Sequence, residues 1–378
     1  MPRILLIHAS VGGGHKRAAA ALADAFGRRQ PGQVEIADVL DYTNPVFREA
    51  YARSYLQLTD KLPQLWGYMY EQTDRELFRF TADVRAVANE ISTAGLGKLM
   101  RKFQPEVIVC THFLPVEILS ARKGRSGLKQ PLYCVLTDYA AHQFWAYRNV
   151  DGYFVATDQT RDQLVTRGVP AALIRVAGIP VDPAIARPKT MAATRAAHDL
   201  PPEGEQPVIT LFGGGLQGAH VRTIITELAA TGLRATLVVV AGRNAALQTE
   251  LDGLTSTTSL TVRTLGFISY VDDLIVASDL VITKAGGLTV SEVLARARPM
   301  IIIDPIPGQE ESNADYLVGV GAALGIRLPQ HVPFAVTRLL ADTDRLDQMR
   351  LAAAHVARPR AALDIAEAIL HDLGARQG

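Results

Sequence analysis

The chain has 378 residues, of which 48% are hydrophobic and 20% are charged, and its formal net charge is +1 at pH 7. This composition is typical of a globular protein and excludes an intrinsically disordered or membrane-embedded chain. The length exceeds the usual size of a single hydrophobic core, so we expect two domains.

No apolar run in the sequence approaches the roughly 20 residues needed to cross a bilayer, and the first residues lead directly into an apolar strand. We therefore expect neither a membrane span nor a signal peptide. A cytoplasmic location is the expectation that follows. The two cysteines, Cys110 and Cys134, lie in apolar, strand-like runs. They are predicted to be buried free thiols, with no disulfide and no metal site.

The first half of the chain predicts a parallel α/β sheet, because apolar runs alternate with stretches rich in helix-forming residues. A glycine-rich turn, Ser10–His15, leads from the first strand into a helix over Lys16–Phe26. Later strands end in polar motifs that contain His112, Asp138, His142 and Trp145. The carboxyl ends of such strands meet at one crevice. The expected strands cover residues 3–7, 34–39, 106–110, 131–136, 152–156 and 174–178.

His15 is the most informative single residue of this half. It ends the glycine turn and lies on the first turn of a helix, where the helix dipole disfavours a charged imidazolium. A neutral imidazole can accept a proton, so His15 is the leading candidate for a general base. The alternative is that His15 only binds an acceptor or the phosphates of a donor, and Asp138 is the second candidate for the base.

The stretch from Tyr42 to Phe80 is rich in aromatic side chains, including Trp66 and Tyr68, interleaved with arginine and lysine. Two interpretations are open. The stretch forms a helical hairpin that covers the core, or it is an interfacial segment that rests at the headgroup level of an anionic membrane.

A stretch rich in proline and polar residues, 181–206, predicts a hinge between the two domains. Alternating strands and helices resume after it, with a glycine loop of their own, and indicate a second doubly wound domain. The expected strands cover residues 207–212, 235–241, 260–265, 279–283 and 299–303.

The segment Thr283–Glu292 predicts an anion site in this second domain. A strand, a Gly-Gly turn and a helix that begins at about Leu288 leave unpaired N–H groups at a helix N-terminus, and Lys284 adds a full positive charge. Glu292 can accept hydrogen bonds from vicinal hydroxyls, which together with a phosphate indicates a nucleotide. A second loop, Gly213, Gly214, Gly215 and Gln217, either serves close packing or faces the same ligand.

Four motifs occur in order, and together they carry a family resemblance: Ser10–His15, Phe212–Gly215, Gly266–Leu274, and Thr283–Glu292 followed by Pro305–Ala314. The chain resembles the processive diacylglycerol glycosyltransferases and monogalactosyldiacylglycerol synthases, which share a family with the peptidoglycan N-acetylglucosaminyltransferase. The resemblance implies the GT-B fold, in which two Rossmann-like domains enclose a cleft. It implies a first domain over 1–180, a second over 207–357, and a last helix over 358–378 that packs back on the first.

The function implied by the resemblance is transfer of glucose or galactose from a UDP-sugar to the hydroxyl of 1,2-diacylglycerol, with inversion, in a single round or in repeated rounds. The protein is then peripheral on the inner face of the cell membrane, with no nucleic-acid partner. No Asp-x-Asp motif lies at a suitable strand end, so neither a metal nor another cofactor is expected. The alternatives are transfer to a polyprenyl-linked acceptor, sugar epimerisation, and a nonenzymatic nucleotide-sugar sensor.

The resemblance also distributes roles over residues of the four motifs and the strand ends. Residues expected to bind the UDP-sugar are Gly213, Gly214, Gly215, Gln217, Phe267, Ile268, Lys284, Gly286, Gly287, Leu288, Thr289, Glu292, Gln309, Glu310 and Asn313. Within this set, Phe267 and Ile268 are expected at the uracil, Lys284 and Thr289 at the phosphates, Glu292 at the ribose, and Gln309, Glu310 and Asn313 at the sugar. Residues expected at the acceptor or the membrane are Gly13, Gly14, His112, His142, Trp145, Trp66 and Tyr68.

Overall fold

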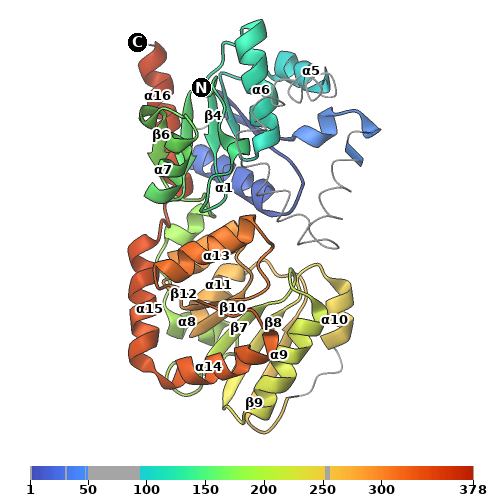
Figure 1. The fold of residues 1–378 in the computed structure, drawn as a ribbon, viewed down its shortest axis with the longest axis vertical. Coiled ribbons are helices and arrows are strands. Elements are labelled where there is room, and N and C mark those ends of the chain that lie inside the picture. Colours follow the sequence, from blue (N-terminus) through green and yellow to red (C-terminus); the bar gives the residue numbers. More distant parts are fainter. Residues whose placement is uncertain (1, 30–31, 47, 50–93, 252–255, 378) are drawn as a thin grey trace. The chain divides into compact units, whose positions relative to one another are not determined.

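The computed structural model describes residues 2–29, 32–46, 48–49, 94–251 and 256–377 (Figure 1). Its contacts divide the chain into two compact units. Unit 1 comprises Met1–Ala184, Ile306–Ser312 and Arg360–Gly378, and unit 2 comprises Ile185–Pro305 and Asn313–Pro359. Each unit is built around its own sheet.

Within its described residues, unit 1 contains a six-stranded sheet in the order β2-β1-β3-β4-β5-β6, and all neighbouring strands are parallel. The strands predicted from the apolar runs are confirmed, with ends that differ by at most two residues. They are β1 (Arg3–His8), β2 (Gln33–Asp38), β3 (Val107–Cys110), β4 (Leu132–Val135), β5 (Gly152–Val155) and β6 (Ile174–Val176).

The alternation of side chains along β1 divides the core of unit 1 into two layers. Leu5 and Ile7 lie in the cluster that contains side chains of α5 and α6, whereas Ile4 and Leu6 lie in the cluster that contains α1 and α16. Helices therefore cover both faces of the sheet, as buried parallel strands require. The helices are α1 (Gly14–Arg29), α5 (Ala94–Phe103), α6 (Phe113–Ser126), α7 (Asp158–Thr166) and α16 (Ala361–Gln377).

Unit 2 contains a second six-stranded parallel sheet within its described residues, in the order β12-β11-β10-β7-β8-β9. Five of its strands were predicted, and the short strand β12 was not. The strands are β7 (Val208–Phe212), β8 (Ala235–Val240), β9 (Leu260–Leu265), β10 (Leu280–Thr283), β11 (Met300–Ile302) and β12 (Ala323–Gly325).

The core of unit 2 also has two layers. Ile209 and Leu211 of β7 share one cluster with side chains of α9, α14 and α15, and Val208 shares the other with side chains of α11. Both sheets thus have the doubly wound α/β architecture that the sequence predicted (Figure 1). The helices are α8 (Met191–Ala197), α9 (Gly218–Ala230), α10 (Ala245–Leu251), α11 (Val271–Ala277), α12 (Gly287–Ala295), α13 (Gln309–Gly319), α14 (Val332–Ala341) and α15 (Thr343–Val356), and the part of α13 up to Ser312 belongs to unit 1.

In each sheet the first strand is the point at which the strand order reverses. β1 pairs with β2 on one side and β3 on the other, and β7 pairs with β8 and β10. Open α/β sheets bind ligands at such a switch point, outside the carboxyl ends of the strands. The fold therefore directs attention to the loops after β1 and β3 in unit 1, and after β7 and β10 in unit 2.

The two cysteines confirm the prediction of buried free thiols. Cys110 and Cys134 lie opposite one another on β3 and β4, both are buried and neither is bonded to another cysteine. Burial raises the pKa of both thiols, which makes them unreactive. Among the helices of the described ranges, none is long and apolar enough to cross a bilayer.

Candidate active site

The switch point of unit 1 is occupied by His15, the second residue of α1. Two hydrogen bonds join it to Thr111, the residue after β3. His15 Nδ1 donates to the carbonyl oxygen of Thr111 at 2.7 Å, and Thr111 Oγ1 donates to the carbonyl oxygen of His15 at 2.9 Å. The loop after β1 and the loop after β3 are thereby fixed to one another, with the imidazole between them.

The contact with Thr111 determines which nitrogen of His15 can act as a base. A carbonyl oxygen only accepts, so Nδ1 carries the proton and Nε2 carries the lone pair. Burial lowers the pKa of His15 to about 4, against a smaller opposing effect of the Thr111 hydrogen bond. The sequence attributed a neutral imidazole to the helix dipole, whereas in the structure burial is the main cause.

His112 and His142 have the same local role in the backbone. His112 caps α6, and its Nδ1 accepts from the amide of Leu114 at 3.0 Å. His142 caps the 3₁₀ turn η3 (Gln143–Trp145), and its Nδ1 accepts from the amide of Phe144 at 3.1 Å. Both rings are almost completely buried. The rings of His15 and His112 meet edge to face, with centroids 4.5 Å apart.

The loop after β4 completes the surroundings of His15. Thr137 Oγ1 lies 3.0 Å from His15 Nδ1, and the neighbouring Asp138, the second candidate for the base, is buried. Trp145 is 3% exposed, so it forms part of the apolar core, with its ring centroid 6.5 Å from that of His15. Gly13 and Gly14 lie at the start of α1, where Gly13 is exposed.

In unit 2, the loops after β7 and β10 touch at the switch point. A Cβ added to Gly215 would lie 2.7 Å from Cε of Lys284, so the lysine side chain lies directly against the glycine backbone. A Cβ added to Gly214 would lie 2.6 Å from the carbonyl oxygen of Ala241. Gly214 thus serves close packing, one of the two roles that the sequence left open, and Gly215 makes room for a cation.

Helix α12 begins beside Lys284, with Gly286 as its N-cap and Gly287 as its first residue. Gly286 has no side chain to cap the helix, and the N–H groups at a helix N-terminus can bind an anion. Thr289 is half-buried on the first turn, whereas Leu288 and Glu292 are buried. A helix N-terminus with a lysine in front of it suits a diphosphate.

The loop after β9 carries an exposed aromatic ring. Phe267 is 67% exposed, and the guanidinium of Arg243, which follows β8, lies over its face, 4.8 Å from the ring centroid. Ile268 packs against the core. An exposed ring at the carboxyl edge of the sheet is a surface on which a uracil can stack.

The residues predicted for the sugar lie on α13 and have specific hydrogen-bonding contacts. Glu310 is buried, and its Oε2 accepts from the amide of Ile306 at 3.0 Å. Asn313 is fully buried, and its Nδ2 donates to the carbonyl oxygen of Ala285 at 3.0 Å. Asn313 therefore supports the loop that precedes α12. Gln309 is the first residue of the helix and is half-buried, and Gln217 is the N-cap of α9.

Several polar residues at these two sites were given no role from the sequence, although Thr111 and Thr137 lie in the motifs predicted at the strand ends. Thr111 and Thr137 hold His15, and Arg243 covers Phe267. A further pair joins α9 to the end of β11, with His220 Nδ1 2.6 Å from Asp304 Oδ2. Asp304 has a φ of +46°, which is uncommon for a residue other than glycine. The pair lies near the switch point of unit 2, because α9 follows β7 in the chain and β11 pairs with β10.

Trp66 and Tyr68, and most of the aromatic and basic stretch Tyr42–Phe80, lie outside the described residues. Both interpretations of that stretch stay predictions. Among the described residues, no group of three or more His, Cys, Asp or Glu side chains is arranged to hold a metal ion, and metal independence likewise stays a prediction.

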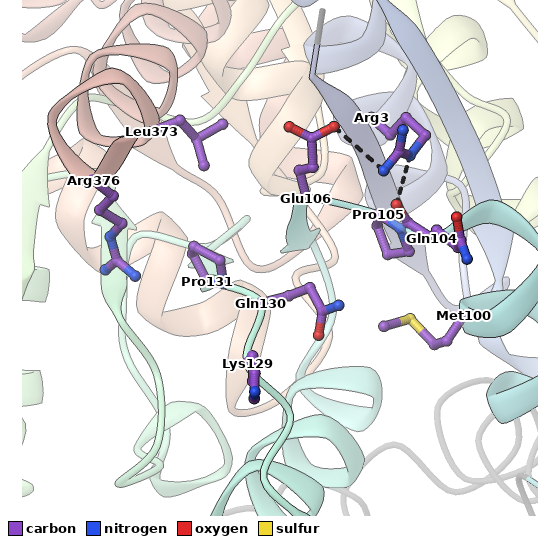
Figure 2. Close-up of a pocket in the computed structure, with 10 residues that line it drawn as sticks. All are labelled: Arg3, Met100, Gln104, Pro105, Glu106, Lys129, Gln130, Pro131, Leu373 and Arg376. Atoms are coloured by element: carbon purple, nitrogen blue, oxygen red, sulfur yellow. Dashed lines mark hydrogen bonds and ion pairs between the residues drawn. The ribbon is translucent and has the colours of Figure 1, made fainter. Parts of the chain in front are cut away.

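Unit 1 also contains a pocket of about 610 Å³, which lies away from the histidines. Figure 2 shows Arg3 in contact with Glu106 and with the carbonyl oxygen of Gln104 on one side, and Arg376 of α16 on the other. Arg3 begins β1, and Glu106 precedes β3. The pocket therefore opens at the amino ends of the strands, whereas His15 follows the carboxyl end of β1.

Models of two known protein families match the two halves of the chain separately. A family model described as monogalactosyldiacylglycerol (MGDG) synthase matches residues 15–181, and one described as the glycosyltransferase family 28 C-terminal domain matches residues 208–369. A processive diacylglycerol beta-glucosyltransferase of Bacillus cytotoxicus is 30% identical over 376 residues, which cover 98% of this chain and 94% of the relative.

Solved structures of low sequence identity share the fold. MurG of Acinetobacter baumannii superposes with a TM-score of 0.62 at 18% identity, over 98% of this chain and 100% of that chain. The Anabaena protein Alr3699/HepE, solved in complex with UDP-glucose, has a TM-score of 0.57 at 15% identity, over 99% and 100% of the two chains. The fold is GT-B, and the match to the Bacillus relative spans nearly the whole of both chains. This chain therefore belongs to the diacylglycerol glycosyltransferase family that its four motifs predicted.

Proposed function

We propose that this protein transfers glucose from UDP-glucose to the free hydroxyl of 1,2-diacylglycerol, with inversion at the anomeric carbon, and that it acts at the inner face of the cell membrane. The observation that carries the chemistry is the hydrogen bond from His15 Nδ1 to the carbonyl oxygen of Thr111. This contact leaves Nε2 as a proton acceptor at a switch point of the sheet, the usual place for a substrate in this architecture.

The proposed mechanism divides the work between the units. His15 removes the proton of the acceptor hydroxyl as its oxygen attacks the anomeric carbon. The UDP leaving group gains negative charge on its diphosphate, which the N-terminus of α12 and the ammonium of Lys284 stabilise. Glu292 is proposed for the ribose hydroxyls, Phe267 for the uracil, and Gln309 with Glu310 for the hexose.

Glucose is favoured over galactose by the relatives. The relative named as a beta-glucosyltransferase matches both halves of the chain, whereas the model named after a galactosyl product matches only residues 15–181. That half carries the proposed acceptor site and not the proposed donor site. We also propose that the protein transfers sugars repeatedly, because the same relative is named processive. Neither a metal nor another cofactor is proposed, because the helix N-terminus and Lys284 can carry the charge of the leaving group.

The test is to incubate the purified protein with mixed micelles of diacylglycerol and either UDP-[¹⁴C]glucose or UDP-[¹⁴C]galactose, with EDTA present. Thin-layer chromatography should show a labelled glycolipid from UDP-glucose, with slower bands if further sugars are added. Label transferred only to a polyprenyl phosphate acceptor in a parallel reaction would favour the polyprenyl alternative. Binding of UDP-glucose without any labelled lipid would leave a nucleotide-sugar sensor.

A further inference from the structure

Among the described residues, the imidazole of His112 makes a structural hydrogen bond at Nδ1 and none at Nε2. Nδ1 accepts from the amide of Leu114 at 3.0 Å and caps α6. The side chain is 2% exposed, and its backbone is extended, as at other helix caps. Within the part of the chain that the structure describes, the ring of His112 makes one hydrogen bond, and that bond is through Nδ1.

The capping contact fixes the tautomer of His112. A backbone amide only donates, so Nδ1 is unprotonated and a neutral ring carries its proton on Nε2. Burial lowers the pKa of His112 well below its ordinary value, and the neighbouring His15 and His8 lower it further. The ring is therefore neutral at physiological pH, and Nε2–H is a hydrogen-bond donor.

His15, whose ring meets that of His112 at 4.5 Å and 77°, has the opposite tautomer. Its Nδ1–H is held by the carbonyl oxygen of Thr111, so its Nε2 accepts. Two neighbouring imidazoles thus offer one lone pair and one N–H. A molecule with a hydroxyl and, close to it, a second oxygen that can accept a hydrogen bond matches both nitrogens. Diacylglycerol has such a pair. The glycerol carbon next to the one with the free hydroxyl carries an ester, and the carbonyl oxygen of that ester can accept a hydrogen bond.

We propose that Nε2–H of His112 donates a hydrogen bond to the ester carbonyl oxygen beside the free hydroxyl of diacylglycerol, and so positions that hydroxyl on Nε2 of His15. This inference rests on the proposed function and specifies how the acceptor is recognised. His112 is then a specificity residue for an acylated glycerol over an acceptor without the carbonyl.

The competing explanation is that His112 is only a helix cap. A cap needs an acceptor at the position of Nδ1, which asparagine provides well, and it has no use for a donor at Nε2. Two substitutions separate the two nitrogens. His112→Asn retains an oxygen near the position of Nδ1 and removes the donor. His112→Gln places an amide N–H near the position of Nε2 and removes the cap.

The experiment measures kcat/KM with UDP-glucose for two acceptors, a 1,2-diacylglycerol and the matching 1,2-dialkylglycerol, in which ether linkages replace the esters and the carbonyl oxygens are gone. The wild-type protein should prefer the ester by about tenfold. His112→Asn should unfold at nearly the wild-type temperature. Its kcat/KM on the ester should fall about tenfold, so that the ratio of kcat/KM for ester to that for ether is near one. His112→Gln should be less stable but keep a clear preference for the ester.

Different outcomes refute different parts of this scheme. A wild-type protein that uses ester and ether equally well would overturn the proposal without recourse to any variant. The same holds if His112→Asn keeps the wild-type ratio, in which case His112 is a cap alone. A wild-type protein that transfers no sugar to either acceptor would instead refute the proposed function, and the inference with it.

Discussion

His15 and Thr111 are joined by two hydrogen bonds of opposite direction, one from the imidazole to the carbonyl oxygen of Thr111 at 2.7 Å and one from the threonine hydroxyl to the carbonyl oxygen of His15 at 2.9 Å. Together they tie the start of α1 to the end of β3 and leave a single ring nitrogen available.

The stability of the protein should depend on pH through its buried histidines. Burial lowers the pKa of His15 to about 4, and it also lowers the pKa of His112 and of His8. An unfolded histidine titrates near pH 6.5. Between pH 6.5 and 4 the unfolded chain therefore binds more protons, and the free energy of unfolding falls as the pH is lowered. Above pH 6.5 these groups contribute no pH dependence.

Urea denaturation at pH 7 and pH 5 measures this effect. Each histidine changes the free energy of unfolding by up to about 1.4 kcal/mol per pH unit. In His15→Asn the contribution of His15 to this pH dependence should be missing. If the wild-type protein and that variant lose the same stability between pH 7 and pH 5, the pKa of His15 is not lowered in the folded protein. The acid limb of kcat/KM should likewise lie near pH 4 if His15 is the base. A limb centred on pH 6.5 would argue for an ordinary histidine.

Phe267→Ala should weaken UDP binding about tenfold, because a base stacked on an aromatic ring is worth about 1–3 kcal/mol. The ring is 67% exposed, so its removal should change the melting temperature little. Phe334→Ala is a matched control. Phe334 is also 67% exposed, and Arg338 lies over its ring at 5.7 Å. Isothermal titration with UDP should show weaker binding for Phe267→Ala than for Phe334→Ala. If the two variants bind UDP equally well, the uracil lies elsewhere.

Gly214→Ala and Gly215→Ala should have different effects, although the two glycines are adjacent. At Gly214 the added methyl would meet the backbone oxygen of Ala241 at 2.6 Å, so the variant should lose stability. At Gly215 it would meet the flexible end of Lys284 at 2.7 Å. Gly215→Ala should remain folded but bind UDP less tightly, because the ammonium is displaced. Melting temperatures and UDP titrations test both, and unchanged affinity in the Gly215 variant would remove Lys284 from the phosphates.

The sequence predicted the fold well because parallel strands covered on both faces appear as continuous apolar runs. Arg3–His8 and Ala235–Val240 are clear examples. The strand Ala323–Gly325 was missed because it is three residues long and has no β-branched or aromatic residue. The turns after β1, β7 and β10 were also predictable, since glycines and a helix start are local features.

The partners of the site residues were less predictable. Thr111 is 96 positions from His15 in the chain, and Arg243 reaches Phe267 from a different loop. Such contacts depend on which strands are neighbours, which the pattern of apolar runs does not specify. Asn313 is another example, because the sequence did not indicate that its side chain is fully buried and donates to the carbonyl oxygen of Ala285; its expected contact with the sugar stays a prediction. Burial of a polar residue is a property of the packed structure.

The proposed function requires that His15 removes the proton of a diacylglycerol hydroxyl while glucose leaves UDP. The most direct measurement compares kcat for glycolipid formation in the wild-type protein and in His15→Asn, with UDP affinity measured on the same preparations. The asparagine amide can still donate to the carbonyl oxygen of Thr111, so the fold of the loops should be retained. We predict a loss of kcat of about 10²–10⁴-fold with unchanged UDP affinity. A variant that forms glycolipid at the wild-type rate would show that His15 is not the base.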